Sequence, residues 1–428
     1  MVIIPALIKI FIIFAVILSL NRLRLNLGIS LLIGALILGS WMGMDFMAIL
    51  KSILTSLTRL QTLSLALIVW LIMVLSGLME KGGNMDRLVK SFSSLSKDGR
   101  TVGAVMAALI GLLPMPGGAL FSAPMVEASI SDVSITGEQK TAVNYWFRHI
   151  WEFWWPLYPG VILAIALLEV TALYFMAMMI SVTLISILAG ILFILRPMGK
   201  LEIHEKAEFS WLGIRYFIQE LIPILIVVFF IFAITIAVNL LGRFGVDFRI
   251  DSGLAVLPGL IIAIAWVCRY NNISAKEIKT AVLKKNAWSM VFLILSIMAF
   301  KNVMSDSQAV LQIRNDMVTY GIPLILVIML MPFLSGLIMG IAVGFVGVSF
   351  PLIIPMFQTP DLLNYLSTAG LAYTFGYMGM LLSPVHLCFL VSKDYYNASL
   401  LNTYPHIIRP AIAVMSISVL CYSFLKLF

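Results

Sequence analysis

The sequence predicts an all-α polytopic membrane protein, and three observations lead to this fold class. Of the 428 residues, 61% are hydrophobic and only 11% are charged, whereas about a quarter of the residues of a soluble protein are charged. The apolar residues come in blocks long enough to cross hydrocarbon, which takes about 20 helical residues. These blocks are continuous rather than alternating with polar residues, which excludes a transmembrane β-barrel.

Ten full spans and two interrupted segments are predicted along the chain. The full spans lie near residues 3–20, 27–45, 62–79, 142–167, 171–195, 217–241, 252–268, 287–304, 366–391 and 408–427. The interrupted segments, 103–130 and 321–357, are apolar but rich in Gly and Pro. A polar linker at 197–216 divides the chain into two halves of similar pattern.

The basic residues predict how the chain is oriented, because cytoplasmic loops carry an excess of Lys and Arg. If each interrupted segment returns to its own side, 19 of the 28 Lys and Arg residues fall in loops on one side. Those loops are 21–26, 80–102, 131–141, 196–216, 268–286 and 393–409. We therefore expect a multi-pass protein of the cell membrane, with its N-terminus outside and its central linker in the cytoplasm. The net charge of +8 belongs to this topology and does not predict nucleic-acid binding.

The two halves share a weak internal repeat. Gly and Pro marks recur at a nearly constant offset of 225 to 228 positions, pairing Gly28 with Gly253, Gly34 with Gly259, Ser122 with Ser349 and Pro156 with Pro384. Five full spans in each half would place the second copy on the opposite side of the membrane. This pattern predicts an inverted repeat, an architecture common among secondary transporters.

The first interrupted segment carries Pro114, Pro116, Gly117 and Gly118 within five residues. Pro removes a helical hydrogen bond and Gly frees the backbone, so the helix should open here. Opened backbone inside a membrane is tolerated where it is buried in protein or faces a water-filled cavity. Its amides suit an anion and its carbonyls suit Na⁺. The alternative is a kinked helix that packs through small residues.

The second interrupted segment has its predicted tip at Gly344 to Ser349, which includes Gly347 and is the repeat-mate of Gly117 to Ser122. The same backbone argument makes this tip a candidate binding site. The alternative is that glycines four residues apart form a packing face between helices.

The span at 142–167 contains polar residues at membrane depth. Asn144, Arg148 and Glu152 are four residues apart, so they share one helix face, and Pro156 should break the helix near mid-bilayer. Ionisable residues at such depth line a pathway or pair with each other. Arg148 and Glu152 are therefore either functional or a structural ion pair. His149 points about 100° away from Arg148 on a helix of 3.6 residues per turn.

The matching span at 366–391 carries Tyr377, Ser383 and Pro384, and His386 follows Pro384 as Tyr158 follows Pro156. A His at a helix break can exchange protons near neutral pH, but a lone intramembrane His is more often a packing residue. The four histidines and the three cysteines have no spacing typical of a metal site or a disulfide framework.

The stretches LLPMPGGALFSAPMVEA (residues 112–128) and NYWFRHIWEFWWPLYPG (residues 144–160) resemble a prokaryotic family of integral membrane proteins of unassigned function. That family is similar to the gluconate permeases, within the ion transporter superfamily. The resemblance implies two inverted five-span repeats, each with a re-entrant hairpin and a broken helix. It also implies a scaffold, a transport part that moves as an elevator, and a homodimer. The chain lacks the Ser-Asn-Thr motif that dicarboxylate carriers have in each hairpin tip.

These predictions divide the chain into scaffold spans at 1–102 and 217–320 and a transport part at 103–196 and 321–428, joined by the linker. The function predicted is a secondary active transporter, not an enzyme, for a small anionic organic solute such as a sugar acid or a carboxylate. The residues predicted to bind the solute are Pro116, Gly117, Gly118, Ser122, Asn144, Arg148, Tyr158, Gly344, Gly347, Ser349, Tyr377, Ser383 and His386.

Coupling is expected to Na⁺ or H⁺, and the chain has no nucleotide-binding loop for direct drive by ATP. The residues predicted for ion or proton coupling are His149, Glu152, His386 and Glu127, with Na⁺ placed at Gly117, Gly118, Gly347 and Val348. No resident metal or cofactor is expected. Two alternatives stay open: a Na⁺/H⁺ antiporter that uses Glu127 or Glu152, and a membrane scaffold or assembly protein that transports nothing.

Overall fold

The computed structural model of the chain describes residues 5–84, 87, 98–112, 114, 118–130, 134–201, 211–244, 254–321, 323–357 and 361–426. This part of the chain is helical and contains no β-strand, which confirms the prediction of an all-α protein.

The helices of the first half are α1 (Ala6–Arg22), α2 (Leu27–Trp41), α3 (Phe46–Thr58), α4 (Leu60–Lys81), α6 (Gly99–Gly111), α7 (Ala119–Ser129), α8 (Gly137–Arg148), α9 (Pro159–Leu168), α10 (Ala172–Gly190), η1 (Ile191–Leu195) and η2 (Arg196–Met198). Those of the second half are α11 (Trp211–Arg243), η3 (Leu254–Val256), α12 (Leu257–Tyr270), α13 (Ala275–Val282), α14 (Lys285–Asp306), α15 (Ala309–Tyr320), α16 (Leu324–Met339), α17 (Ala342–Ile353), η4 (Ile354–Met356), α18 (Leu362–Leu381), α19 (Leu387–Tyr395) and α20 (Leu400–Leu425).

Five helical stretches in the described part of the chain are long and apolar enough to cross a membrane. They are Leu60–Lys81, Ala172–Met198, Ile218–Val238, Ala275–Asp306 and Leu400–Leu425. Because every backbone polar group of such a stretch is paired within the helix, it can lie in hydrocarbon. The chain is therefore a multi-pass membrane protein, as predicted.

Two pairs of consecutive helices form hairpins that are too short to span. In the first pair, α6 and α7 have 13 and 11 residues, or about 20 and 16 Å at 1.5 Å per residue. In the second pair, α16 and α17 pack against each other on either side of a turn at Gly340. Hydrocarbon is about 30 Å thick, so none of these four helices is long enough to cross it alone.

The second hairpin turns four residues before the predicted tip. Gly340 takes the left-handed conformation, with φ +64°, which costs little only for glycine. Its amide closes α16 on the carbonyl of Gly336, and α17 begins at Ala342. Residues 344 to 349 are therefore helical, and the prediction that they form the tip was wrong.

Two further helices are broken. The first break, residues 149–158, separates α8 from α9 and consists of turns and bends. The second break, residues 382–386, separates α18 from α19. Both lie inside the spans predicted at 142–167 and 366–391, and both contain the Pro that predicted them, Pro156 and Pro384.

Tyrosines of α18 satisfy carbonyl groups of the first break. Pro156 has no N–H, so it cannot bond the carbonyl of Glu152 four residues earlier. The hydroxyl of Tyr373 donates to that carbonyl instead, at 2.9 Å. One turn further, the hydroxyl of Tyr377 donates to the carbonyl of His149 at 2.7 Å. An unpaired carbonyl in a membrane costs several kcal/mol, so these tyrosines allow the break to exist.

The second break is satisfied in the same way from other helices. The hydroxyl of Tyr145, on α8, donates to the carbonyl of Leu381 at 2.9 Å. The hydroxyl of Tyr404, on α20, donates to the carbonyl of Leu382 at 3.1 Å. The breaks thus tie α8, α18 and α20 together.

Helix positions repeat between the halves. Pro159 and Leu387, which begin α9 and α19, are 228 positions apart, as are Ala172 and Leu400, which begin α10 and α20. Contacts between the halves are reciprocal, because each contacting pair of helices has a counterpart pair. The pair α2 and α14 corresponds to α12 and α4, the pair α7 and α19 to α17 and α9, and the pair α8 and α20 to α18 and α10.

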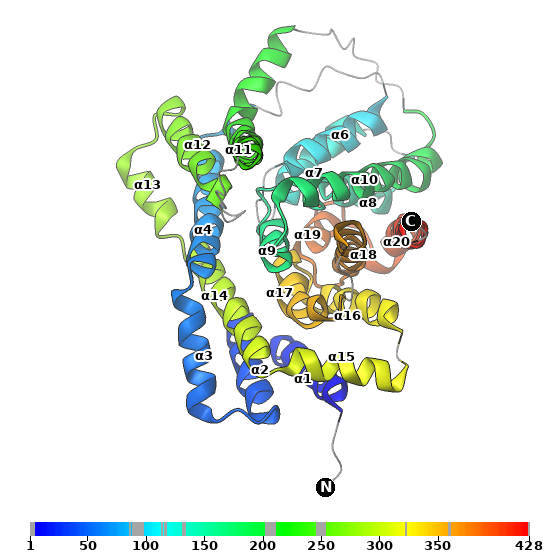
Figure 1. Cartoon of the computed structure of the whole chain (residues 1–428). Helices are drawn as coiled ribbons and strands as arrows, with labels where there is room; N and C mark the ends of the chain where they lie inside the picture. Colours follow the sequence, from blue (N-terminus) through cyan, green and yellow to red (C-terminus); the bar gives the residue numbers. More distant parts are fainter. Residues whose placement is uncertain are drawn as a thin grey trace.

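In Figure 1, α3, α4 and α12–α14 form one group and α6–α10 with α16–α20 form another. The groups meet where α9 packs on α4 and α17 packs on α14.

Candidate functional site

The two hairpin turns and the two helix breaks meet inside the second group of helices. At the first hairpin, Gly118 lies against the guanidinium of Arg148 at the start of the first break. At the second, Gly340 lies against Ser383 and His386 of the second break. Gly160, at the start of α9, packs on Ala342 at the start of α17. Residues at the ends of both hairpins and at both breaks are therefore gathered in one buried region.

Arg148 is the buried cation of this region. It ends α8 and is only 1% exposed. A Cβ at position 118 would lie closer than 3.0 Å to the guanidinium, a separation that real Cβ atoms essentially never show. Glycine at position 118 therefore makes the room that the guanidinium occupies. A buried cation is costly unless negative groups or acceptors surround it.

Asn144 connects three helices one turn before Arg148. Its Nδ2 donates to the carbonyl of Ala119 at 3.2 Å and to Oγ of Ser392 at 2.9 Å, which joins α8 to α7 and α19. Its Oδ1 is buried and has no hydrogen-bond partner among the described residues. Buried polar atoms are normally paired, so this oxygen is an acceptor that a donor on a solute could use.

The two breaks bring two histidines together. Nε2 of His149 and Nε2 of His386 are 3.1 Å apart, although the residues are 237 positions apart in the chain. Oε1 of Glu152, which is 9% exposed, lies 3.8 Å from Nε2 of His149. The donor atoms of His149, His386 and Cys388 lie within 4.8 Å of one another. Sequence spacing gave no sign of this cluster, because helix packing, not spacing, assembles it.

Several predicted residues use their polar groups within the protein. The hydroxyls of Ser122 and Ser349 donate to carbonyls of their own helices. The hydroxyl of Tyr158 donates to the carbonyl of Gly111, and that of Tyr377 to the first break. The hydroxyl of Ser383 accepts from the amide of Val385 at 3.4 Å.

Other predicted residues differ in place from the prediction. Gly344, in the first turn of α17, and Gly347 and Val348, further along it, are helical, so Gly347 and Val348 do not form the hairpin tip at which Na⁺ was predicted. Gly347 instead allows α17 to approach Ile297 of α14. Glu127 is half-exposed and pairs with Lys140, with Oε1 and Nζ 2.8 Å apart. Pro116 and Gly117 lie outside the described residues.

Three residues of the site were not anticipated from the sequence. Cys388 and Ser392 sit on α19 and reach His149 and Asn144 of the other half. Tyr145 packs its ring against both His149 and His386, with centroids 4.8 and 5.4 Å apart. Cys388 follows His386 by two residues, and this is the one sequence signal that could have drawn attention to it.

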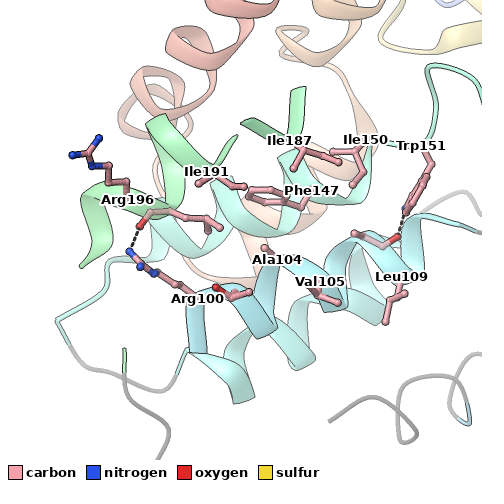
Figure 2. Close-up of a pocket in the computed structure, with 13 residues that line it drawn as sticks. Arg100, Ala104, Val105, Leu109, Phe147, Ile150, Trp151, Ile187, Ile191 and Arg196 are labelled. Carbon is pink, nitrogen blue, oxygen red and sulfur yellow. Dashed lines mark hydrogen bonds between the residues drawn. The ribbon is translucent and has the colours of Figure 1, made fainter. Parts of the chain in front are cut away.

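Two apolar cavities lie beside the breaks. One, of about 470 Å³, runs from Arg100 and Arg196 to Ile150 and Trp151 of the first break, and Figure 2 shows these residues around it. Trp151, which lines this cavity, donates Nε1 to the carbonyl of Ala108 at 2.7 Å.

The second cavity, of about 890 Å³, reaches Leu382, Pro384 and Val385 of the second break and has Arg22 on its wall. Both are lined mainly by apolar side chains, which suits lipid chains more than a charged solute.

The set of membrane-length helices, short hairpins and broken helices defines a polytopic α-helical membrane protein with an internal polar site. Residues 4–425 match the DUF401 family, which is described as protein of unknown function. The chain belongs to this family. Among curated proteins, none matches the chain.

Proposed function

We propose that this protein is a secondary active transporter that moves a small organic anion, such as a sugar acid or a carboxylate, with Na⁺ or H⁺. The observation that carries the proposal is the meeting of two hairpin turns and two helix breaks beside the buried guanidinium of Arg148. Non-helical backbone at membrane depth is typical of transporter binding sites. Such backbone is stable here because tyrosine hydroxyls donate hydrogen bonds to carbonyls at the breaks. The amides at the N-termini of the helices that follow are then left for a ligand.

An anion fits this place for two reasons. Helices α7, α9, α17 and α19 all begin at the turns or breaks, and a helix N-terminus attracts negative charge by about 0.3–1 kcal/mol. Arg148 adds a full positive charge and a planar fork of donors that suits carboxylates. Asn144 supplies an acceptor for a hydroxyl, through Oδ1, as a sugar acid would require.

The proposed architecture is the inverted repeat of the ion transporter superfamily, to which the gluconate permeases belong. Reciprocal contacts between counterpart helices are what a two-fold axis produces, because each pairing must then occur twice. We assign residues 1–102 and 217–320 to the scaffold, and 103–196 and 321–428 to a transport part that moves as an elevator in a homodimer. The surfaces that would slide are those of α9 on α4 and α17 on α14.

Uptake by purified protein in proteoliposomes tests the proposal. Gluconate and citrate, each with an imposed Na⁺ or pH gradient, serve as the first solutes. We expect uptake by the native chain, and at least a tenfold loss in Arg148→Gln. Arg196→Gln is the matched control, because Arg196 lies on the rim of the apolar cavity and should leave uptake unchanged.

Because Arg148→Gln could fold poorly, Gly118→Ala provides a second variant. The added methyl group displaces the flexible end of Arg148 rather than backbone, so the protein should keep its melting temperature and lose uptake. A folded Gly118→Ala protein with native uptake would contradict the placement of the solute.

Two outcomes would favour the alternatives. Na⁺-dependent proton release in vesicles without an organic solute would indicate a Na⁺/H⁺ antiporter, for which Glu152 is the buried carboxylate at the first break. Failure of the native protein to move any solute or ion would favour a membrane scaffold or assembly protein.

A further inference from the structure

We propose that His149, His386 and Cys388 form a binding site for a soft monovalent metal ion, and that the ion bound in the cell is Cu⁺. This site lies beside the proposed anion site but does not depend on the proposed function. It is assembled from both helix breaks: His149 is the first residue of one break, His386 precedes α19, and Cys388 is the second residue of α19.

The geometry fits shared coordination of one ion. Ligand atoms bound to one ion at about 2.0–2.3 Å lie roughly 3.3–3.8 Å apart in tetrahedral or trigonal arrangements. The two Nε2 atoms are 3.1 Å apart, and all three donor atoms lie within 4.8 Å of one another. Small side-chain movements would therefore close the three ligands onto an ion.

Hydrogen bonding already prepares His149 as a ligand. Its Nδ1 lies 2.6 Å from the carbonyl of Tyr145, which can only accept, so Nδ1 carries the proton and Nε2 presents its lone pair. Metal-binding histidines typically donate their other ring N–H to a backbone carbonyl in this way. Nδ1 of His386 has no partner in the described part of the chain, so its proton can move to Nδ1 and free Nε2 for an ion.

The ligand set selects the ion. Binding uses the thiolate of Cys388: M⁺ joins the sulfur, and where the sulfur carries a proton the S–H bond breaks and H⁺ leaves to solvent. Two imidazoles and one thiolate gathered around one point are the ligand set of trigonal copper sites, and a soft thiolate ligand favours Cu⁺.

The test measures metal binding to purified protein in detergent, with no transport solute present, so its failure is distinct from failure of transport. The background is Cys268→Ser with Cys421→Ser, because these two cysteines are partly or fully exposed and would bind soft metals elsewhere. Cu⁺ is supplied under reductant against a chromophoric chelator, Ag⁺ serves as an air-stable monovalent probe, and Zn²⁺ is the divalent comparison.

We expect one equivalent of Cu⁺ or Ag⁺ per chain, and a rise in melting temperature because the ion binds only the folded state. Adding Cys388→Ser should weaken binding at least 100-fold, and His386→Asn provides a second variant should the serine protein not fold. Undiminished binding in both variants, the absence of monovalent binding, or tighter binding of Zn²⁺ than of Cu⁺ would each overturn the proposal.

Discussion

Removal of the hydroxyl of Tyr373 tests whether tyrosines make the first break possible. In Tyr373→Phe the carbonyl of Glu152 loses its hydrogen bond of 2.9 Å, and Pro156 cannot replace it because it has no N–H. A buried acceptor left unpaired costs about 1–3 kcal/mol, so we expect a loss of about 2 kcal/mol in the free energy of unfolding.

Tyr377→Phe supplies the internal comparison. The carbonyl of His149 keeps a second partner, the amide of Glu152 at 3.2 Å, when the hydroxyl of Tyr377 is removed. Side-chain hydrogen bonds in membrane proteins average about 0.6 kcal/mol when alternatives exist, so this loss should be at most about 1 kcal/mol. The loss in Tyr373→Phe should therefore exceed the loss in Tyr377→Phe by about 1 kcal/mol.

Unfolding in mixed micelles with increasing sodium dodecyl sulfate, followed by circular dichroism, measures both losses. Tyr174→Phe is the control, because Tyr174 is exposed on α10 and should lose nothing. Equal losses in Tyr373→Phe and Tyr377→Phe, or none in Tyr373→Phe, would refute the role given to Pro156.

Two other changes test packing away from the breaks. Gly379→Ala should destabilise the protein by about 3 kcal/mol, because the new Cβ would lie closer than 3.0 Å to the backbone of Phe333, which forces α16 and α18 apart. Glu220→Gln should lower the free energy of unfolding by about 2–3 kcal/mol. The two oxygens of the buried carboxylate accept from Nδ2 of Asn84 and Nε of Arg87, both at 2.6 Å, whereas the side-chain amide of Gln has only one acceptor oxygen. The same unfolding assay measures both losses.

Each of these changes has a control and a contrary result. Gly77→Ala should be neutral, because the nearest atom to its new Cβ lies 4.0 Å away; a native-like Gly379→Ala protein would contradict the close packing of α16 on α18. Glu277→Gln is the control for Glu220, since Glu277 caps an exposed helix end. If both glutamine variants unfold alike, the network around Glu220 contributes little stability.

The hydrophobic pattern predicted the fold class and most helices, because burial in lipid demands long apolar helices whatever their neighbours are. Proline and glycine predicted where helices break: Pro156 and Pro384 lie in the two observed breaks. The pattern misplaced the second hairpin turn, because Gly340 and Gly344 are both glycines and the sequence does not show which of them forms the turn. Only packing decides which of them takes a positive φ.

By itself the sequence predicted that Arg148, Glu152, His149 and His386 lie at membrane depth, because composition and helical rise depend only on local order. The tertiary structure alone decided what they meet. It set Gly118 against Arg148, His149 within 3.1 Å of His386, and Cys388 beside both. The contacts of His149 with His386 and Cys388 join residues more than 200 positions apart, and no local pattern encodes them because they follow from how α8, α18 and α19 pack.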